Sequence, residues 1–242
     1  MHDNAAERLH DLLSAFKGVA NQPMLSAWAA VLGVERDNLP ELLHAVAAVT
    51  ALPAQLEADL RAALPDSDLE LFLAWKPKVE AAMQGFANSG NAADGVQRQY
   101  DDATLVSLQH ASHALRSSGR ELQDDQLTAL AGALQGLDEL ISGSADIDPE
   151  LQVFLLDLVY EMKRAVRLVR VQGVDGLQVA LERSVGAICV RAGLGQPLPD
   201  PGSQVGRRFF AVIAQLGGLI AFGNSSFALG GNVLDVLRAI GS

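Results

Sequence analysis

Residues 146–171 read DIDPELQVFLLDLVYEMKRAVRLVRV, and this stretch decides the fold class. Asp148 can cap a helix, Pro149 suits a first helical turn, and Glu150 favours the positive end of a helix dipole. Apolar residues then recur every three or four positions for more than five turns, which is the period of an amphipathic α-helix. Gly173 ends the pattern. We therefore expect a long helix that buries one face against neighbouring helices.

The rest of the chain has the same helical character. Ala and Leu supply most of the apolar side chains, aromatic residues make up only 5%, and alternating β-branched segments are nearly absent. With 242 residues, of which 49% are hydrophobic, the chain can bury a large core. The sequence predicts an all-α fold, a multi-helix bundle in two packed parts with a C-terminal apolar helical hairpin.

Two stretches rich in glycine, proline and small polar residues separate the helical patterns. The clearest linker is NSGNAADG at 88–95, and the second is LGQPLPDPGS at 194–203. These linkers predict three parts, which are an N-terminal helical subdomain over 1–88, a central bundle with the basic helix over 96–193, and a C-terminal Gly-rich hairpin over 205–242.

Residues that carry catalysis or bind metals occur only in weak patterns. His110 and His113 share a helix face, but a zinc site needs further ligands that the sequence does not supply. The acid pairs at 101–102 and 124–125 suit helix starts, where negative charge is favourable. The triplet GLG at 193–195 lacks the third glycine of a dinucleotide-binding fingerprint. We expect no enzyme activity, no metal, no cofactor and no small-molecule substrate.

The net charge of −11 is spread unevenly along the chain. Residues 1–157 hold nine Lys/Arg and 24 Asp/Glu, whereas residues 158–242 hold nine and five. The acidic majority argues against nucleic-acid binding, which needs clustered positive charge. The basic end suits an anionic membrane or an acidic partner, or it packs against the acidic half of the same or a neighbouring copy.

Two basic clusters stand out in the second half. One lies at helical spacing within the long predicted helix and comprises Lys163, Arg164, Arg167 and Arg170. The other, Arg207 and Arg208, directly precedes the last strongly apolar segment. A basic amphipathic helix binds membrane surfaces or acidic helices, and otherwise forms a solvated face. Both clusters are candidate contact sites for a membrane or a partner.

The apolar segment reads FFAVIAQLGGLIAFG over 209–223, and no charge follows it before Asp235. It is shorter than the roughly 20 residues that span a bilayer, and suits a buried or re-entrant helix. Glycines within a helix cost stability, so they predict close helix packing. Three interpretations stay open, which are a hairpin closing the bundle core, an oligomerisation element, and a conditional membrane element hinged at 197–202. The candidate contact residues are Phe209, Phe210, Ile213, Leu216, Gly217, Gly218, Leu219, Ile220 and Phe222.

The layout of Trp28 to Gly33 and the stretch Leu181 to Gly186 resemble those of bacterial helical proteins linked to conflict or phage defence, which implies an effector-like role. Together these features predict a non-enzymatic association protein that binds a protein partner or further copies of itself. It would engage a membrane conditionally through the C-terminal hairpin, as helical toxins do. The alternative is a soluble adaptor or immunity-type protein whose acidic helical face binds a basic partner. The first residues lack the basic and apolar segments of a secretory signal peptide, so we expect a cytoplasmic location.

Overall fold

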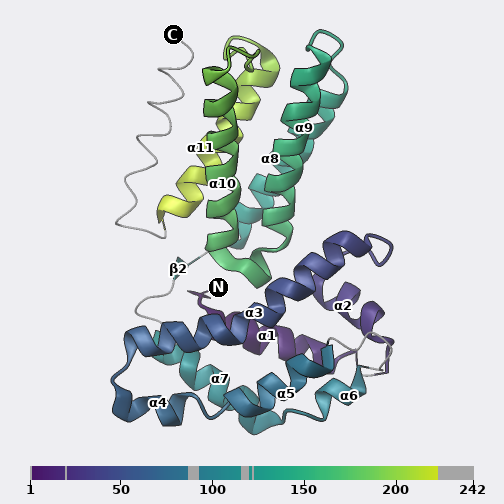
Figure 1. Ribbon diagram of the computed structural model, residues 1–242. Coiled ribbons are helices and arrows are strands. Elements are labelled where there is room, and N and C mark those ends of the chain that lie inside the picture. The colour runs from purple at the N-terminus through teal and green to yellow at the C-terminus, as the bar shows by residue number, and fades with distance from the viewer. Residues whose placement is uncertain (1, 20, 87–92, 116–119, 122, 223–242) are drawn as a thin grey trace. The chain divides into compact units, whose positions relative to one another are not determined.

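The computed structural model describes residues 2–19, 21–86, 93–115, 120–121 and 123–222 (Figure 1). These residues form eleven α-helices and one pair of two-residue strands, β1 (His2–Asp3) and β2 (Arg120–Glu121). The all-α prediction is confirmed. Contacts divide the chain into two compact units. We call them the N-terminal unit, residues 2–120 with 170–173, and the C-terminal bundle, residues 121–169 with 174 onwards.

Seven helices form the N-terminal unit, and α1 and α3 lie at its centre. α1 packs against α2, α3 and α7, while α2, α4, α5 and α7 all contact α3. The largest buried side chains include Phe16, Trp28 and Trp75, and the rings of Phe16 and Trp28 lie 4.9 Å apart. The helices are α1 (Ala5–Lys17), α2 (Met24–Leu32), α3 (Leu39–Ala63), α4 (Asp66–Phe72), α5 (Lys76–Phe86), α6 (Asp94–Gln97) and α7 (Asp102–Leu115).

Polar side chains at helix ends connect these helices as well as capping them. The Asn4 side-chain oxygen accepts a hydrogen bond from the Glu7 backbone N–H (2.9 Å), and its amide donates to Ser112 Oγ of α7 (3.2 Å). The Tyr100 hydroxyl donates to the Leu13 carbonyl (2.8 Å), and burial raises the pKa of this phenol. Such bonds satisfy polar groups that would be costly to bury alone.

Four long helices alternate up and down in the C-terminal bundle (Figure 1). They are α8 (Asp124–Ser142), α9 (Pro149–Arg167), α10 (Val169–Gly193) and α11 (Gln204–Phe222). α8 packs against α9 and α11. α10 reaches α9 through an ion pair between Arg183 and Glu161 (3.5 Å) and meets α11 where Leu181 approaches Gly217. Each helix therefore has two antiparallel neighbours, as in an up-down four-helix bundle.

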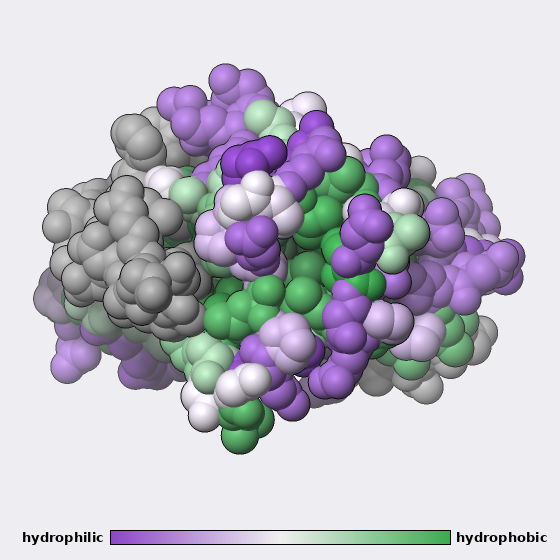
Figure 2. All heavy atoms as spheres, turned by 90° about the horizontal axis from the view of Figure 1, so that it is seen from above, coloured by the Kyte–Doolittle hydropathy of each residue, from purple (hydrophilic) through white to green (hydrophobic). Residues whose placement is uncertain are grey.

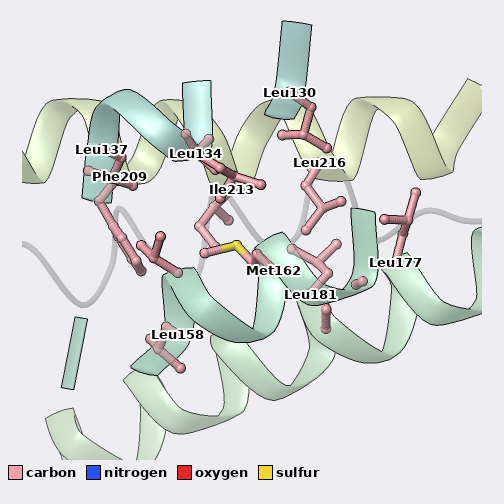
Figure 3. Packing of buried hydrophobic residues seen from close by; sticks show 14 of the residues in the cluster. Leu130, Leu134, Leu137, Leu158, Met162, Leu177, Leu181, Phe209, Ile213 and Leu216 are labelled. Atoms are coloured by element: carbon pink, nitrogen blue, oxygen red, sulfur yellow. The ribbon is translucent and has the colours of Figure 1, made fainter. Parts of the chain in front are cut away.

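The apolar face of α11 fills the centre of this bundle. Phe209, Ile213 and Leu216 are each at most 1% exposed. They lie among residues of the other three helices in Figure 3, which labels Leu130, Leu134, Leu137, Leu158, Met162, Leu177 and Leu181. The outer side of α11 is polar or small, with Arg207, Arg208, Ala211, Gln215 and Gly218 exposed. α11 is thus an amphipathic core helix.

The long helix predicted to run to Val171 ends earlier. α9 stops at Arg167, and Leu168 caps it by donating its N–H to the Arg164 carbonyl (3.0 Å). A short turn follows before Gly173, whose φ of 64° and ψ of −157° break the helical path. Only glycine adopts such angles readily, so the expected break at Gly173 is confirmed.

The contact boundaries differ from the predicted domain limits of 1–88, 96–193 and 205–242. α6 and α7 follow the linker at 88–95, yet α6 packs against α5 and α7 against α1 and α3. The N-terminal unit therefore continues to residue 120. α11 shares one core with α8, α9 and α10. The second arm of the predicted hairpin, residues 226–240, lies outside the described residues.

Helix α3 is long and apolar enough to cross a membrane by length and composition, with a mean hydropathy of 1.2. Core helices pass the same test. α3 contains Pro53 and contributes Leu42, Val49, Leu52, Leu56 and Leu60 to the buried core of the N-terminal unit. One side of α3 is therefore buried in the N-terminal unit, and 39% of its most apolar window is buried.

Replacement of Ile213 by Ala tests the position of α11. Ile213 is buried among the other three helices, so its loss should lower the free energy of unfolding by about 2–5 kcal/mol. Gln215→Ala on the exposed side of the same helix should change it by less than about 0.5 kcal/mol. Urea unfolding followed by circular dichroism measures both. Equal effects of the two substitutions would contradict burial of this face.

Candidate association surface

The predicted basic stripe of α9 is engaged within its own bundle. Lys163 Nζ lies 2.7 Å from Asp138 Oδ2 and 2.7 Å from Gln135 Oε1, both on α8. Arg164 pairs with Glu161 of the same helix at 2.7 Å. These contacts place the first two cations of the stripe against acids and amides of α8 and α9.

The last two cations of the stripe, Arg167 and Arg170, lie in different parts of the structure. Arg167 is exposed at the last position of α9, whereas Arg170 lies beyond the helix end, in the segment 170–173 that belongs to the N-terminal unit. The expected continuous row of four cations therefore does not form, because the helix ends before its last member.

Acids and bases are mixed within each unit. The N-terminal unit holds ten Lys/Arg against 15 Asp/Glu, and the C-terminal bundle holds eight against 14. The charge asymmetry along the sequence arises because the acids of α8 and early α9 precede the cations of late α9, α10 and α11. Folding brings these helices side by side, so the sequence asymmetry does not produce a basic unit and an acidic unit.

The predicted contact residues of α11 fall into two groups. Phe209, Ile213, Leu216, Leu219 and Ile220 are buried, and Phe210 is half-buried. Arg207, Arg208 and Gly218 are exposed, and Gly217 is half-buried. Phe222 is the last residue of α11, and its side chain lies outside the description. The buried group contributes to the core and leaves mainly small, basic and amide-bearing residues on the surface of this helix.

Gly217 and Gly218 of α11 are not explained by close helix packing. A Cβ added at Gly217 would meet Leu181 Cδ2 at 3.8 Å, an ordinary van der Waals distance. A Cβ at Gly218 would meet nothing within 4 Å. The predicted requirement for small residues therefore does not follow from contacts inside the bundle.

Arg191 holds the first half of the connection from α10 to α11, which the sequence predicted as a hinge. This side chain is only 6% exposed, its Nε donates to the Pro197 carbonyl (2.7 Å), and Nη1 lies 3.5 Å from Glu150. Its guanidinium also lies over the Phe154 ring, 4.8 Å from the centroid. A cation that binds both a loop carbonyl and an aromatic ring holds the loop against α9 and α10.

The second half of the connection is fixed by Ser203 and Gly206. Ser203 Oγ accepts the Gly206 N–H (2.9 Å), as an N-cap does, and donates to the Asp200 carbonyl (2.7 Å). A Cβ at Gly206 would overlap that same carbonyl, so this position requires glycine. The start of α11 is therefore held against the preceding loop by these contacts.

Asp101, a member of one of the acid pairs, caps a helix. Asp101 Oδ1 accepts the Thr104 N–H (3.0 Å) and hydroxyl (2.7 Å), which caps α7. The Lys78 ammonium, 2.6 Å away, together with these bonds from Thr104, holds the pKa of Asp101 well below its usual range. His110 and His113 are exposed, and the described residues contain no group of three metal-ligating side chains.

Exposed large apolar side chains of the C-terminal bundle gather on two helices. Val153 and Tyr160 lie on α9, and Val179, Val190 and Leu194 lie on or directly after α10, each 47–67% exposed. Among described side chains, α8 and α11 expose none of this size. Figure 2 views the molecule from above, along the helices of this bundle, so the outward sides of α9 and α10 run along the line of sight; at this end of the bundle, apolar surface lies open between polar side chains. We call the solvent side of these two helices the α9–α10 face.

The two helices of this face are aligned antiparallel. The Arg191 contacts with Glu150 and Phe154 fix one end, and the Arg183–Glu161 pair fixes the middle. Val153 therefore lies level with Val190. The sequence did contain a signal for this face, because apolar residues at 153 and 160 fall seven positions apart on the side opposite the buried stripe.

No family model, no curated protein and no solved structure matches this chain.

Replacement of Gly206 by Ala tests the close contact between the start of α11 and the preceding loop. The added methyl group would overlap the Asp200 carbonyl, so the free energy of unfolding should fall by at least about 2 kcal/mol. Gly132→Ala on α8 adds the same methyl group in open space and should raise it by about 0.5–1 kcal/mol. Thermal unfolding measures both, and a neutral Gly206→Ala would show that the connection is loose.

Proposed function

We propose that this chain is a non-enzymatic association protein, and that its C-terminal bundle binds another protein surface through the α9–α10 face. The observation that carries this proposal is the concentration of exposed Val, Leu and Tyr side chains on two adjacent helices of one bundle. An exposed apolar patch with a polar rim is typical of a binding surface.

The amino-acid types of the face support this role. Tyr160 is large and amphipathic, and tyrosine is enriched at binding interfaces. Arg164 and Arg183 flank the apolar residues and share Glu161, at 2.7 and 3.5 Å, so the charged groups are already ordered. An ordered side chain loses less entropy on binding than a free one.

Membrane engagement through residues 205–242 is a second proposal, supported by the exposed Arg207 and Arg208 at the start of α11. It requires α11 to leave the bundle. Exposing a buried Val, Leu, Ile or Phe side chain costs about 1.5–3 kcal/mol, and α11 buries seven of them among its described side chains, so withdrawal costs on the order of 10–20 kcal/mol. That is comparable with the total stability of a domain. A trigger would have to compensate for this loss.

A soluble adaptor role with a basic partner is the alternative. Both units carry more acids than bases, which supports attraction of a basic surface.

Site-specific photo-crosslinking tests the association proposal in cells. A photoreactive phenylalanine analogue in place of Tyr160 should give protein adducts, because this position lies within the exposed apolar patch. The same analogue in place of Gln215, exposed on α11, serves as the matched control and should give few. Adducts are detected by gel shift and identified by mass spectrometry. Absence of adducts at 160, or equal adducts at both positions, would contradict the proposal. A basic adduct protein would favour the adaptor role.

Vesicle flotation tests the membrane proposal with the full chain. Gly206→Ala loosens the start of α11, so this variant should float with phosphatidylglycerol vesicles more readily than the wild type. Gly132→Ala provides the control for a methyl group added elsewhere. If neither the wild type nor Gly206→Ala floats, the membrane proposal is wrong.

A further inference from the structure

We propose that the α9–α10 face binds the same face of a second copy of this chain, with a two-fold axis beside Tyr160. This inference rests on the proposed function, because it names the occupant of the association surface. A two-fold interface uses the same residues on both copies, so the face must be complementary to itself.

The order of charges along α9 provides this complementarity. Val153, Asp157, Tyr160, Arg164 and Arg167 follow at intervals of three and four and form one stripe. Asp157 lies one turn before Tyr160, and Arg164 lies one turn after it. When two such stripes pack antiparallel about Tyr160, Asp157 of each copy faces Arg164 of the other. The symmetry forms this ion pair twice.

Both members of the pair have free bonding capacity. Asp157 is exposed and makes no ion pair with another described residue. Arg164 binds Glu161 through Nη2, at 2.7 Å, but a guanidinium carries five N–H donors in a rigid fork. The Glu161 contact therefore orients Arg164 and leaves donors for a second carboxylate.

The local charge balance also selects this face for a second copy. The whole chain carries −11, so two copies repel each other over most of their surface. On α9 and α10 near Tyr160 the charges nearly balance, because three arginines lie with four acids. These residues are Arg164, Arg167, Arg183, Asp157, Glu161, Asp175 and Glu182. Two copies can therefore approach at this face with less repulsion than the net charge of the chain would give.

The size of the face predicts a weak dimer. α9 has 19 residues and is about 28 Å long, and two packed helices present a face about 20 Å wide. The dimer would then bury about 1,100 Å² in total, near the lower limit for specific association. We expect monomer and dimer to exchange, with the dimer dominant at high protein concentration.

Charge reversal tests the two-fold arrangement directly. Asp157→Arg and Arg164→Glu each replace two attractive pairs by two repulsive ones, so each should weaken the dimer about tenfold or more. The double substitution Asp157→Arg with Arg164→Glu restores opposite charges and should recover most of the affinity. Glu139→Arg on exposed α8 changes the net charge as Asp157→Arg does, and should leave the dimer intact. Sedimentation velocity of the full chain over a wide concentration range measures each constant.

A steric test uses glycines in open space. Gly186 is exposed on α10, and a Cβ there meets nothing within 4 Å. Gly186→Trp therefore adds bulk to the face without crowding the core, and should lower dimer affinity about tenfold or more. Gly132→Trp adds the same ring to exposed α8 and should have no such effect. The helical circular dichroism signal shows that each variant is folded.

A wild-type chain that stays monomeric at the highest concentration would overturn this inference, and so would a double charge reversal that fails to recover. Either result can be told apart from failure of the proposed function. Crosslinks from position 160 to a protein of another mass would keep the association role and replace the second copy by that partner. No crosslinks from position 160 would remove both.

Discussion

The C-terminal bundle depends on the burial of one face of α11 between α8 and α10. Phe209, Ile213 and Leu216 supply its centre, and none of them is more than 1% exposed. Because these side chains point inward, basic, small and amide-bearing residues are left on the solvent side of α11. This constraint decides which helices are available for binding. The exposed large apolar residues described in this bundle are found on α9 and α10, which is why we propose the association surface there.

Local signals in the sequence predicted the elements of this fold well. Asp148 accepts N–H groups of Glu150 and Leu151 at 3.0 and 3.1 Å, and Asn4 accepts that of Glu7, as expected for N-caps. Gly173 breaks the helical path where its position indicated. These features depend on residues within one or two turns, so neighbouring residues suffice to predict them.

Features that depend on distant residues were predicted less well. The linker at 88–95 separates two helical patterns, but sequence composition does not reveal that α7 returns to pack against α1 and α3. Glycines in an apolar segment indicated close packing, yet Gly217 meets Leu181 only at an ordinary distance, and the glycine that is sterically required is Gly206. That requirement arises from the path of the loop around Asp200. The charge asymmetry was real in sequence order, but the antiparallel topology mixes it within one bundle.

The same topology brings acids and bases together on the α9–α10 face of an acidic chain. Antiparallel α9 and α10 place the cations of one helix beside the acids of the other, as Arg183 and Glu161 show at 3.5 Å. Arginines and acids that already form ion pairs within one copy have fewer hydrogen-bonding positions left for a partner. Such groups can set the orientation of the partner but attract it only weakly. Apolar contact must then supply most of the binding energy, and the exposed Val153, Tyr160 and Val190 are placed to provide it. An association surface of this kind gives reversible binding, because its apolar area is small and its ion pairs are exposed to solvent.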